Sequence, residues 1–186
     1  REAVIPALQD EVSAILMQLG MEKVVIKVML IDTNELSEWG REIAEFHFSA
    51  NPGNPPAPVS KIASGGELSR LMLALKSLIT KKNLLPTIIL DEIDMGVSGE
   101  IAGKVGKLLN NMADSMQLIA ITHLPQIAGK AGEHYKVFKK YADDRTVSAV
   151  MRLSDNDRVE EIAAMLSNEK VSEAAKETAK ELLQKS

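Results

Sequence analysis

The chain has 186 residues, 45% of them hydrophobic, which suffices for one good-sized domain or two small ones with a buried core. It has no cysteine, which excludes disulfides and thiolate metal sites, and its three histidines show no metal-ligand spacing. The net charge of -4 and the 3% aromatic content argue against a surface that coats nucleic acid or stacks bases, although they leave room for a local basic patch. The apolar runs are too short to span a bilayer and no signal-peptide pattern opens the chain, so a cytoplasmic setting is expected.

The first part of the chain is predicted to form a helix, two strands and a connector. Residues 1–20 have the apolar spacing of a helix and end at a glycine, a common helix stop. Residues 24–31 and 42–50 are typical of two antiparallel strands, separated by the turn-rich stretch 32–41. The four prolines in 51–60 bar both a helix and a central strand, so this stretch is predicted to be an extended connector.

A long amphipathic helix is predicted next, introduced by the sequence "ASGGELSR". One face of it carries Leu68, Leu71, Met72, Leu75, Leu78 and Ile79. Ser64 can cap free backbone N–H groups, and Gly65 and Gly66 have no side chain to obstruct an approaching group. Such a helix N-terminus can bind an anion, but from this stretch alone an ordinary capped helix with a flexible lead-in explains the pattern equally well.

A strand, a helix and a second strand are predicted to follow. Residues 87–90 and 117–122 have the composition of short buried strands. The helix between them has an apolar face made of Ile101, Val105, Leu108, Leu109 and Met112. A right-handed crossover makes such strands parallel, so both end at the sheet edge where open α/β sheets bind ligands. That edge is predicted to carry Asp91, Glu92 and His123.

These three residues suit a divided chemical task. Asp91 would hold Mg²⁺, generally through water, while Glu92 would orient and deprotonate an attacking water. His123 would hydrogen-bond a terminal phosphate and sense its presence. Taken singly, an Asp after a strand often caps a helix and a lone His is more often structural. The three together on one edge favour the catalytic interpretation.

The rest of the chain is predicted to support the fold, with a hairpin and two helices. Residues 134–140 and 145–153 alternate like the strands of a hairpin. Residues 157–166 and 170–184 have the apolar spacing of helices.

Three motifs, "IASGGELSR", "TIILDEIDMGVSG" and "LIAITHLPQIA", resemble the signature motif, the Walker B strand with its D-loop, and the switch histidine of ABC-type ATPase heads in SMC-like chromosome and repair proteins. "FHFSANPG", "HYKVFK" and "RVEEIAAML" extend the resemblance over nearly the whole chain. It implies an α/β fold: the C-terminal lobe of a head, with a mainly parallel sheet, flanking helices and antiparallel strand pairs. Residues 1–20 would be a coiled-coil stub, and residues 21–186 the lobe.

The resemblance also implies roles for single residues. The nucleotide-binding set would be Ser64, Gly65, Gly66, Glu67 and Ser98, with Ser64 and Gly66 contacting the γ-phosphate of ATP held by an opposing head. Asp91 would serve magnesium, Glu92 would be the catalytic base and His123 the switch. Ser98 departs from the broader pattern, in which the D-loop usually ends in Asp, and this leaves open how the D-loop couples the two sites.

The phosphate-binding Walker A motif is missing from the sequence. Its three Gly-Lys pairs, at 103, 106 and 129, have no glycine five positions earlier and no following Ser or Thr. In SMC-like proteins the Walker A lobe lies at the other end of a long coiled coil. The expected partners are therefore that N-terminal lobe, a second head in a homodimer and, through the full protein, DNA, with no membrane. This chain alone is expected neither to bind ATP tightly nor to hydrolyse it.

The favoured function is a composite-site ATPase using ATP and Mg²⁺ in bacterial double-strand break repair and recombination, cytoplasmic and nucleoid-associated. A serine hydrolase is disfavoured, because "GVSG" lacks the nucleophile-elbow spacing and "SNEK" stands without companion motifs. A non-catalytic dimerisation or interaction module remains the alternative. Loss of ATPase activity on removing Ser64 or Glu92 would distinguish the two.

Overall fold

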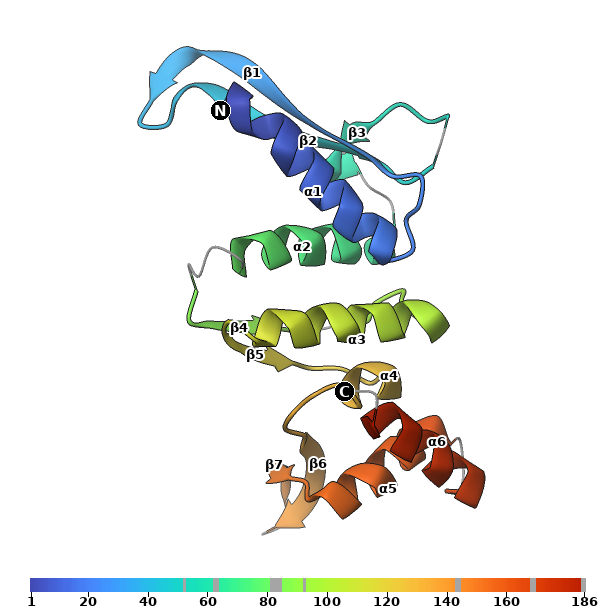
Figure 1. Cartoon of the computed structure of the whole chain (residues 1–186). Helices are drawn as coiled ribbons and strands as arrows, with labels where there is room; N and C mark the ends of the chain where they lie inside the picture. Colours follow the sequence, from blue (N-terminus) through green and yellow to red (C-terminus); the bar gives the residue numbers. More distant parts are fainter. Residues whose placement is uncertain are drawn as a thin grey trace. The chain divides into compact units, whose positions relative to one another are not determined.

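The computed structural model describes residues 1–51, 53–61, 64–80, 85–91, 93–142, 145–167 and 170–184. The chain divides into two compact units, which Figure 1 shows together with their helices and strands. The first consists of Arg1–Val97 with Ser115–Ala120, and the second of Ser98–Asp114 with Ile121–Ser186. Among the helices that the structure describes, none combines the length and the apolar character that a membrane crossing needs.

The first unit opens with the predicted helix. A 3-10 turn, η1 (Glu2–Val4), leads into α1 (Ile5–Gln18). Its buried side is formed by Val12, Ile15, Leu16 and the following Leu19. The helix stops at Gly20, whose φ of 82° lets the Met21 N–H turn back to the Leu16 carbonyl at 2.9 Å. Both the helix and its glycine stop are confirmed.

A three-stranded antiparallel sheet follows, in the order β1-β2-β3. Its strands are β1 (Val25–Ser37), β2 (Gly40–Ser49) and β3 (Ala57–Pro58). The predicted antiparallel pair is confirmed, and Ile26 lies opposite Phe48, with both side chains buried. The prediction of a long turn over 32–41 is wrong, because the two strands extend through most of it.

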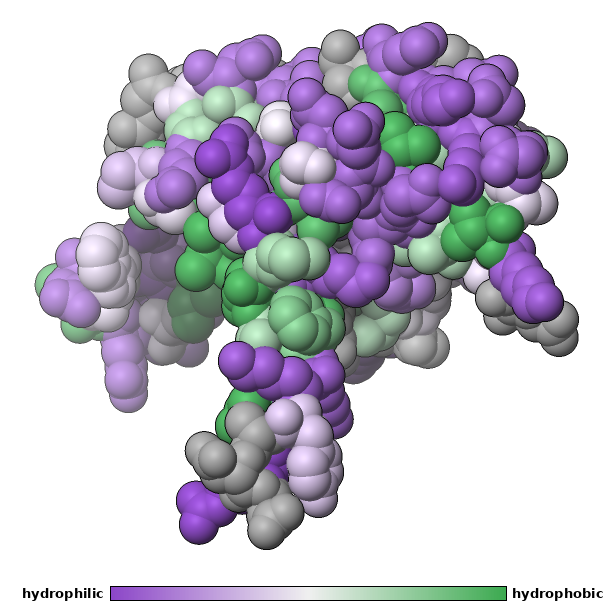
Figure 2. Space-filling view, turned by 90° about the horizontal axis from the view of Figure 1, so that it is seen from below, coloured by the Kyte–Doolittle hydropathy of each residue, from purple (hydrophilic) through white to green (hydrophobic). Residues whose placement is uncertain are grey.

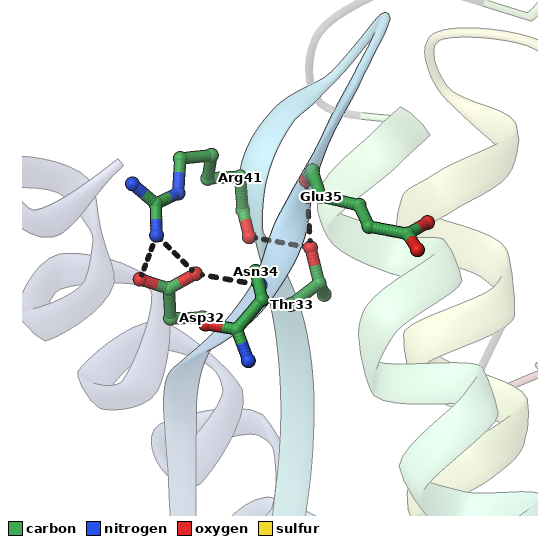
Figure 3. Close-up of polar contacts among 5 residues, drawn as sticks. All are labelled: Asp32, Thr33, Asn34, Glu35 and Arg41. Carbon is green, nitrogen blue, oxygen red and sulfur yellow. Dashed lines mark hydrogen bonds and ion pairs between the residues drawn. The ribbon is translucent and has the colours of Figure 1, made fainter.

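Side-chain hydrogen bonds explain this extension, as Figure 3 shows. The Arg41 guanidinium contacts the Asp32 carboxylate at 3.0 Å across the two strands. The Thr33 hydroxyl lies 2.8 Å from the Arg41 carbonyl and 3.0 Å from that of Glu35. The Asn34 N–H donates to Asp32 Oδ1 at 2.9 Å, with Asn34 at a φ of 59°. The turn-forming residues therefore produce an irregularity within a long hairpin.

The proline-rich connector behaves partly as predicted. Pro58 pairs with His47 at the edge of the sheet, where proline is tolerated because one side needs no donor. Beyond it the chain enters a second 3-10 turn, η2 (Val59–Lys61), so the connector is not extended to its end.

The amphipathic helix is confirmed as α2 (Gly65–Thr80), but its buried face is shifted from the prediction. Met72 and Ile79 are exposed, whereas Ser77 and Thr80 are buried. The two hydroxyls are satisfied within the helix: Ser77 donates to the Ala74 carbonyl at 2.8 Å, and Thr80 to the Ser77 carbonyl at 2.7 Å. Burying these two polar side chains therefore leaves no donor unpaired.

The parallel strand pair is confirmed as β4 (Thr87–Leu90) and β5 (Gln117–Ala120), joined in register. The prediction that both strands are buried is wrong in part. Ile89 and Ile119 lie opposite each other, and they are 62% and 44% exposed. Parallel sheets are normally covered on both faces, so this pair leaves an apolar face open.

The second unit contains most of the remaining helices and a hairpin. Its elements are α3 (Gly99–Ala113), α4 (Pro125–Ala128), β6 (Tyr135–Ala142), β7 (Arg145–Arg152), α5 (Asp155–Leu166) and α6 (Glu173–Gln184). The predicted hairpin and helices are confirmed, with α6 starting a few residues later than expected. Its core includes Ala128, Ile162, Ala163 and Ala179. The face of the molecule seen in Figure 2 is largely hydrophilic, with hydrophobic residues in several patches.

We expect the stability of the second unit to fall as the pH falls below about 6.5, the ordinary pKa of histidine. Burial, helped by the Arg158 charge, lowers the pKa of His134, and its Nδ1 is buried with no hydrogen-bond partner among the described residues. The unfolded chain therefore binds the proton more readily, and stability is lost as the pH falls toward the folded-state value. Thermal unfolding at several pH values checks this. His134→Gln should flatten the pH dependence of the unfolding temperature. The same slope in the variant and the original protein would contradict the prediction.

Candidate functional site

The N-terminus of α2 lies at the surface of the first unit. Ser64 and Gly65 are exposed, Gly66 is buried, and Glu67 is partly exposed in the first turn. Ser64 sits at the start of the helix, and its carbonyl accepts the Leu68 N–H at 3.1 Å. The first N–H groups of a helix have no partner within the helix and carry partial positive charge, so this end suits an anion.

Two glycines hold this helix end against the turn that follows β4. A Cβ on Gly66 would lie 3.2 Å from the Cα and the carbonyl oxygen of Gly96. A Cβ on Gly96 would lie only 2.9 Å from the Gly66 Cα, and Gly96 has a φ of 68°. Both positions therefore need glycine, because two backbones touch there. The Met95 Sδ would lie 3.2 Å from a Cβ on Gly65.

The turn itself is fixed to the first unit. Ile93, Asp94 and Val97 are buried, and the Val97 N–H donates to the Asp94 carbonyl at 3.1 Å. The Ser69 hydroxyl of α2 is 3.5 Å from the Ile93 carbonyl. The start of α2 and residues 93–97 are thus one packed structure, although 24 positions separate Ser69 from Ile93 in the chain.

Asp91 directly follows Leu90, the buried last residue of β4, and is itself exposed. Since Leu90 pairs with Ala120, both parallel strands end at this edge. The described residues hold no group of three His, Asp or Glu side chains that could bind a metal. A lone exposed carboxylate fits Mg²⁺ that keeps several waters and takes its other ligands from phosphates. Glu92, the predicted base, lies outside the described residues.

Ser98 and His123 belong to the second unit. Ser98 is exposed at the N-cap of α3, and its side chain makes no capping bond to the described helix. His123 is exposed and follows β5 by three residues, just before α4. Because Asp91 lies in the first unit, its grouping with His123 and Ser98 stays a prediction.

Gly96 is the site residue that sequence reasoning missed. It lies inside the motif "DEIDMGVSG", where the acidic pair and the serine were selected but the glycine was not. Its signal is present: a glycine in a short turn between a buried strand and a helix often has a positive φ.

No family model matches the sequence. The fold is similar to solved structures of SMC heads. One solved SMC ATPase chain, studied for ATP-driven dimerization and DNA stimulated activation, has a TM-score of 0.61 at 19% identity. The match covers 90% of this chain and 96% of that one. The Smc head with a coiled coil and joint from Pyrococcus yayanosii has a TM-score of 0.68 at 17% identity, over 89% of this chain and 30% of that one. The α/β class and the head fold are thereby confirmed.

The relatives found by sequence are more specific than the SMC heads found by structure. The DNA repair protein RecN of Rickettsia bellii is 43% identical over 183 residues, and that of Deinococcus radiodurans is 43% identical over 183 residues. These matches cover 98% of this chain but only 33% and 32% of the relatives, so the chain spans about a third of their length. This chain matches the C-terminal part of these RecN proteins.

Proposed function

We propose that this chain is the C-terminal lobe of an ATPase head that hydrolyses ATP between two heads during DNA double-strand break repair and recombination. The observation that carries the proposal is the Gly66–Gly96 contact, which holds an exposed helix N-terminus against the turn after Asp91. Residues 1–20 would be the stub of a coiled coil and residues 21–186 the lobe. The full protein would act on DNA as a cytoplasmic, nucleoid-associated protein.

The signature residues would serve the nucleotide of the opposing head. Ser64 and the first amides of α2 would bind its terminal phosphate, with Gly65 and Gly66 leaving the backbone open and Glu67 at the rim. In the head's own site, Mg²⁺ bound with ATP would supply charge neutralisation of the phosphates.

Three residues would act on the head's own nucleotide. Asp91 would hold the metal's water ligands, and Glu92 would accept a proton from the attacking water. His123 would donate a hydrogen bond to the terminal phosphate. Ser98 would lie in the loop between the two sites.

The first expected result concerns the chain alone. Because it has no Walker A motif, the 186-residue chain should show no ATP turnover, and turnover should appear when the N-terminal lobe of the same protein is added. A coupled assay of phosphate release measures this. Turnover by the pure chain that Glu92→Gln abolishes would overturn the requirement for the lobe. Undiminished turnover by the Glu92→Gln variant in the presence of the lobe would favour a non-catalytic interaction module.

The open face of β4 and β5 supports docking of that N-terminal lobe. We expect Ile89→Asp to weaken association with the lobe about tenfold or more, because a charge would be buried in an apolar contact. The isolated chain should stay folded, since Ile89 is already exposed. Val150→Asp, at an equally exposed apolar residue of β7, is the matched control. Equal affinity of both variants for the lobe, measured by calorimetry, would argue against this face.

A further inference from the structure

The tip of the β1–β2 hairpin carries two large apolar side chains in open solvent. Leu36 is 83% exposed and Trp39 is 74% exposed. Further down the hairpin, Ile43 is exposed too, as is Val4 at the start of the chain. Single exposed apolar residues are common, but a leucine and a tryptophan at one hairpin tip, with an exposed isoleucine lower on the same hairpin, are typical of a contact surface.

The hairpin tip is bonded to the beginning of the chain. The Arg1 guanidinium donates to the Glu42 carbonyl at 2.6 Å and also to the Trp39 carbonyl. An open hollow of about 530 Å³ lies between residues 1–3 and residues 39–42. Figure 1 shows the hairpin running alongside α1 and reaching past its N-terminal end. Chain that continued backward from Arg1 along the helix axis would therefore pass the tip.

The Arg1 carbonyl closes the first turn of the chain. It accepts the Val4 N–H at 3.0 Å, and Arg1 is the N-cap of the 3-10 turn η1 that leads into α1. Pro6 lacks a donor N–H, which bends a longer helix without ending it when the turn before is helical. The RecN relatives are about three times as long as the matched part, which is their C-terminal part.

We propose that the segment immediately before Arg1 is a helix whose last two turns, those next to Arg1, pack on Leu36 and Trp39. The hairpin then braces the base of the coiled coil where it enters the head. The inference rests on the proposed role of residues 1–20 as a coiled-coil stub. It requires apolar residues three or four positions apart in the preceding turns, so that one helix face meets the hairpin tip.

Cysteine cross-linking in the full-length protein, with its other cysteines replaced, tests the contact. Leu36→Cys is combined in turn with a cysteine at each of about eight positions before Arg1, which spans two helical turns. With a short bismaleimide, the yield should peak at positions three or four apart. Glu22→Cys, exposed beyond the far end of α1, is the matched control in place of Leu36→Cys and should give no such peaks. Uniform yields, or yields no higher than the control, would overturn the proposal.

Limited proteolysis provides a second measurement. Leu36→Glu should speed cleavage of the segment before Arg1 several-fold, whereas Tyr141→Glu, at an equally exposed aromatic residue of the other hairpin, should not. Equal cleavage rates would count against the brace. Neither measurement needs ATP turnover. A periodic cross-linking pattern in a protein without ATPase activity would retain the brace and reject the ATPase. ATPase activity without a periodic cross-linking pattern would retain the ATPase and reject the brace.

Discussion

Gly96→Ala is expected to destabilise the first unit by about 2–5 kcal/mol. A φ of 68° costs a residue with a Cβ about 1–2 kcal/mol. The new methyl group would also lie 2.9 Å from the Gly66 Cα, and such overpacking typically costs about 1–3 kcal/mol. Because backbone opposes backbone, no side chain can rotate away. Urea unfolding followed by far-ultraviolet circular dichroism, which reports the helices and strands of both units, measures the loss.

Gly99→Ala is the matched control. Gly99 has a similar φ of 55°, but nothing lies within 4 Å of the position of its Cβ. Its substitution should therefore cost only the backbone strain, about 1–2 kcal/mol. If the two variants lose the same stability, the contact between the helix end and the turn has no energetic weight. If Gly96→Ala costs more, the same variant should also lose ATP turnover in the full-length protein, because the α2 amides would no longer be held in place.

Local patterns predicted the elements of this chain well where a single periodicity governs them. The helix of residues 1–20 was recognised from apolar spacing and its terminal glycine, and the parallel strands from two apolar runs. Spacing was less informative for α2, where Ser77 and Thr80 are buried because their hydroxyls bond within the helix. The apolar spacing of a sequence does not reveal buried polar side chains whose hydrogen bonds are made within their own helix.

The β1–β2 hairpin and the strands β4 and β5 show two other limits of prediction from sequence. The stretch 32–41 has turn-forming residues, yet most of it lies in the β1–β2 hairpin, where Asp32 and Arg41 form an exposed ion pair across the strands. Apolar composition predicted burial for β4 and β5, but composition cannot tell whether the covering surface belongs to the same chain. Ile89 and Ile119 are exposed in this one.

The candidate site depended on resemblance more than on pattern. The motif order selected Ser64, Asp91 and His123, and the structure places the first two in one unit. The contact between Gly66 and Gly96 was not foreseen, because it joins backbones thirty positions apart and leaves no repeating signal in the sequence. Close backbone approaches of this kind are set by tertiary packing, and only the need for glycine marks them.

Pairing two inactive heads should restore activity if each site is shared between heads. In the full-length protein, Glu92→Gln should lower ATP turnover about 100-fold or more, because a general base contributes on that scale. Ser64→Arg should do the same by blocking the opposing nucleotide, and Ser64 is exposed, so the head should still fold. A mixed dimer of these variants has one site with both residues intact and one with neither. An equimolar mixture forms half mixed dimers, so it should recover about a quarter of normal turnover if the dimer is symmetric and its sites are independent.

The control for this mixture replaces the Ser64→Arg head with one that carries both substitutions. No pairing then contains an intact site, so phosphate release should stay at the level of the single variants. Recovery in the first mixture but not in the second requires Ser64 and Glu92 to act on one nucleotide from different heads. If neither mixture recovers although the heads dimerise with ATP, then Ser64 acts within its own head, and the helix end that Gly66 and Gly96 hold in place serves a different ligand.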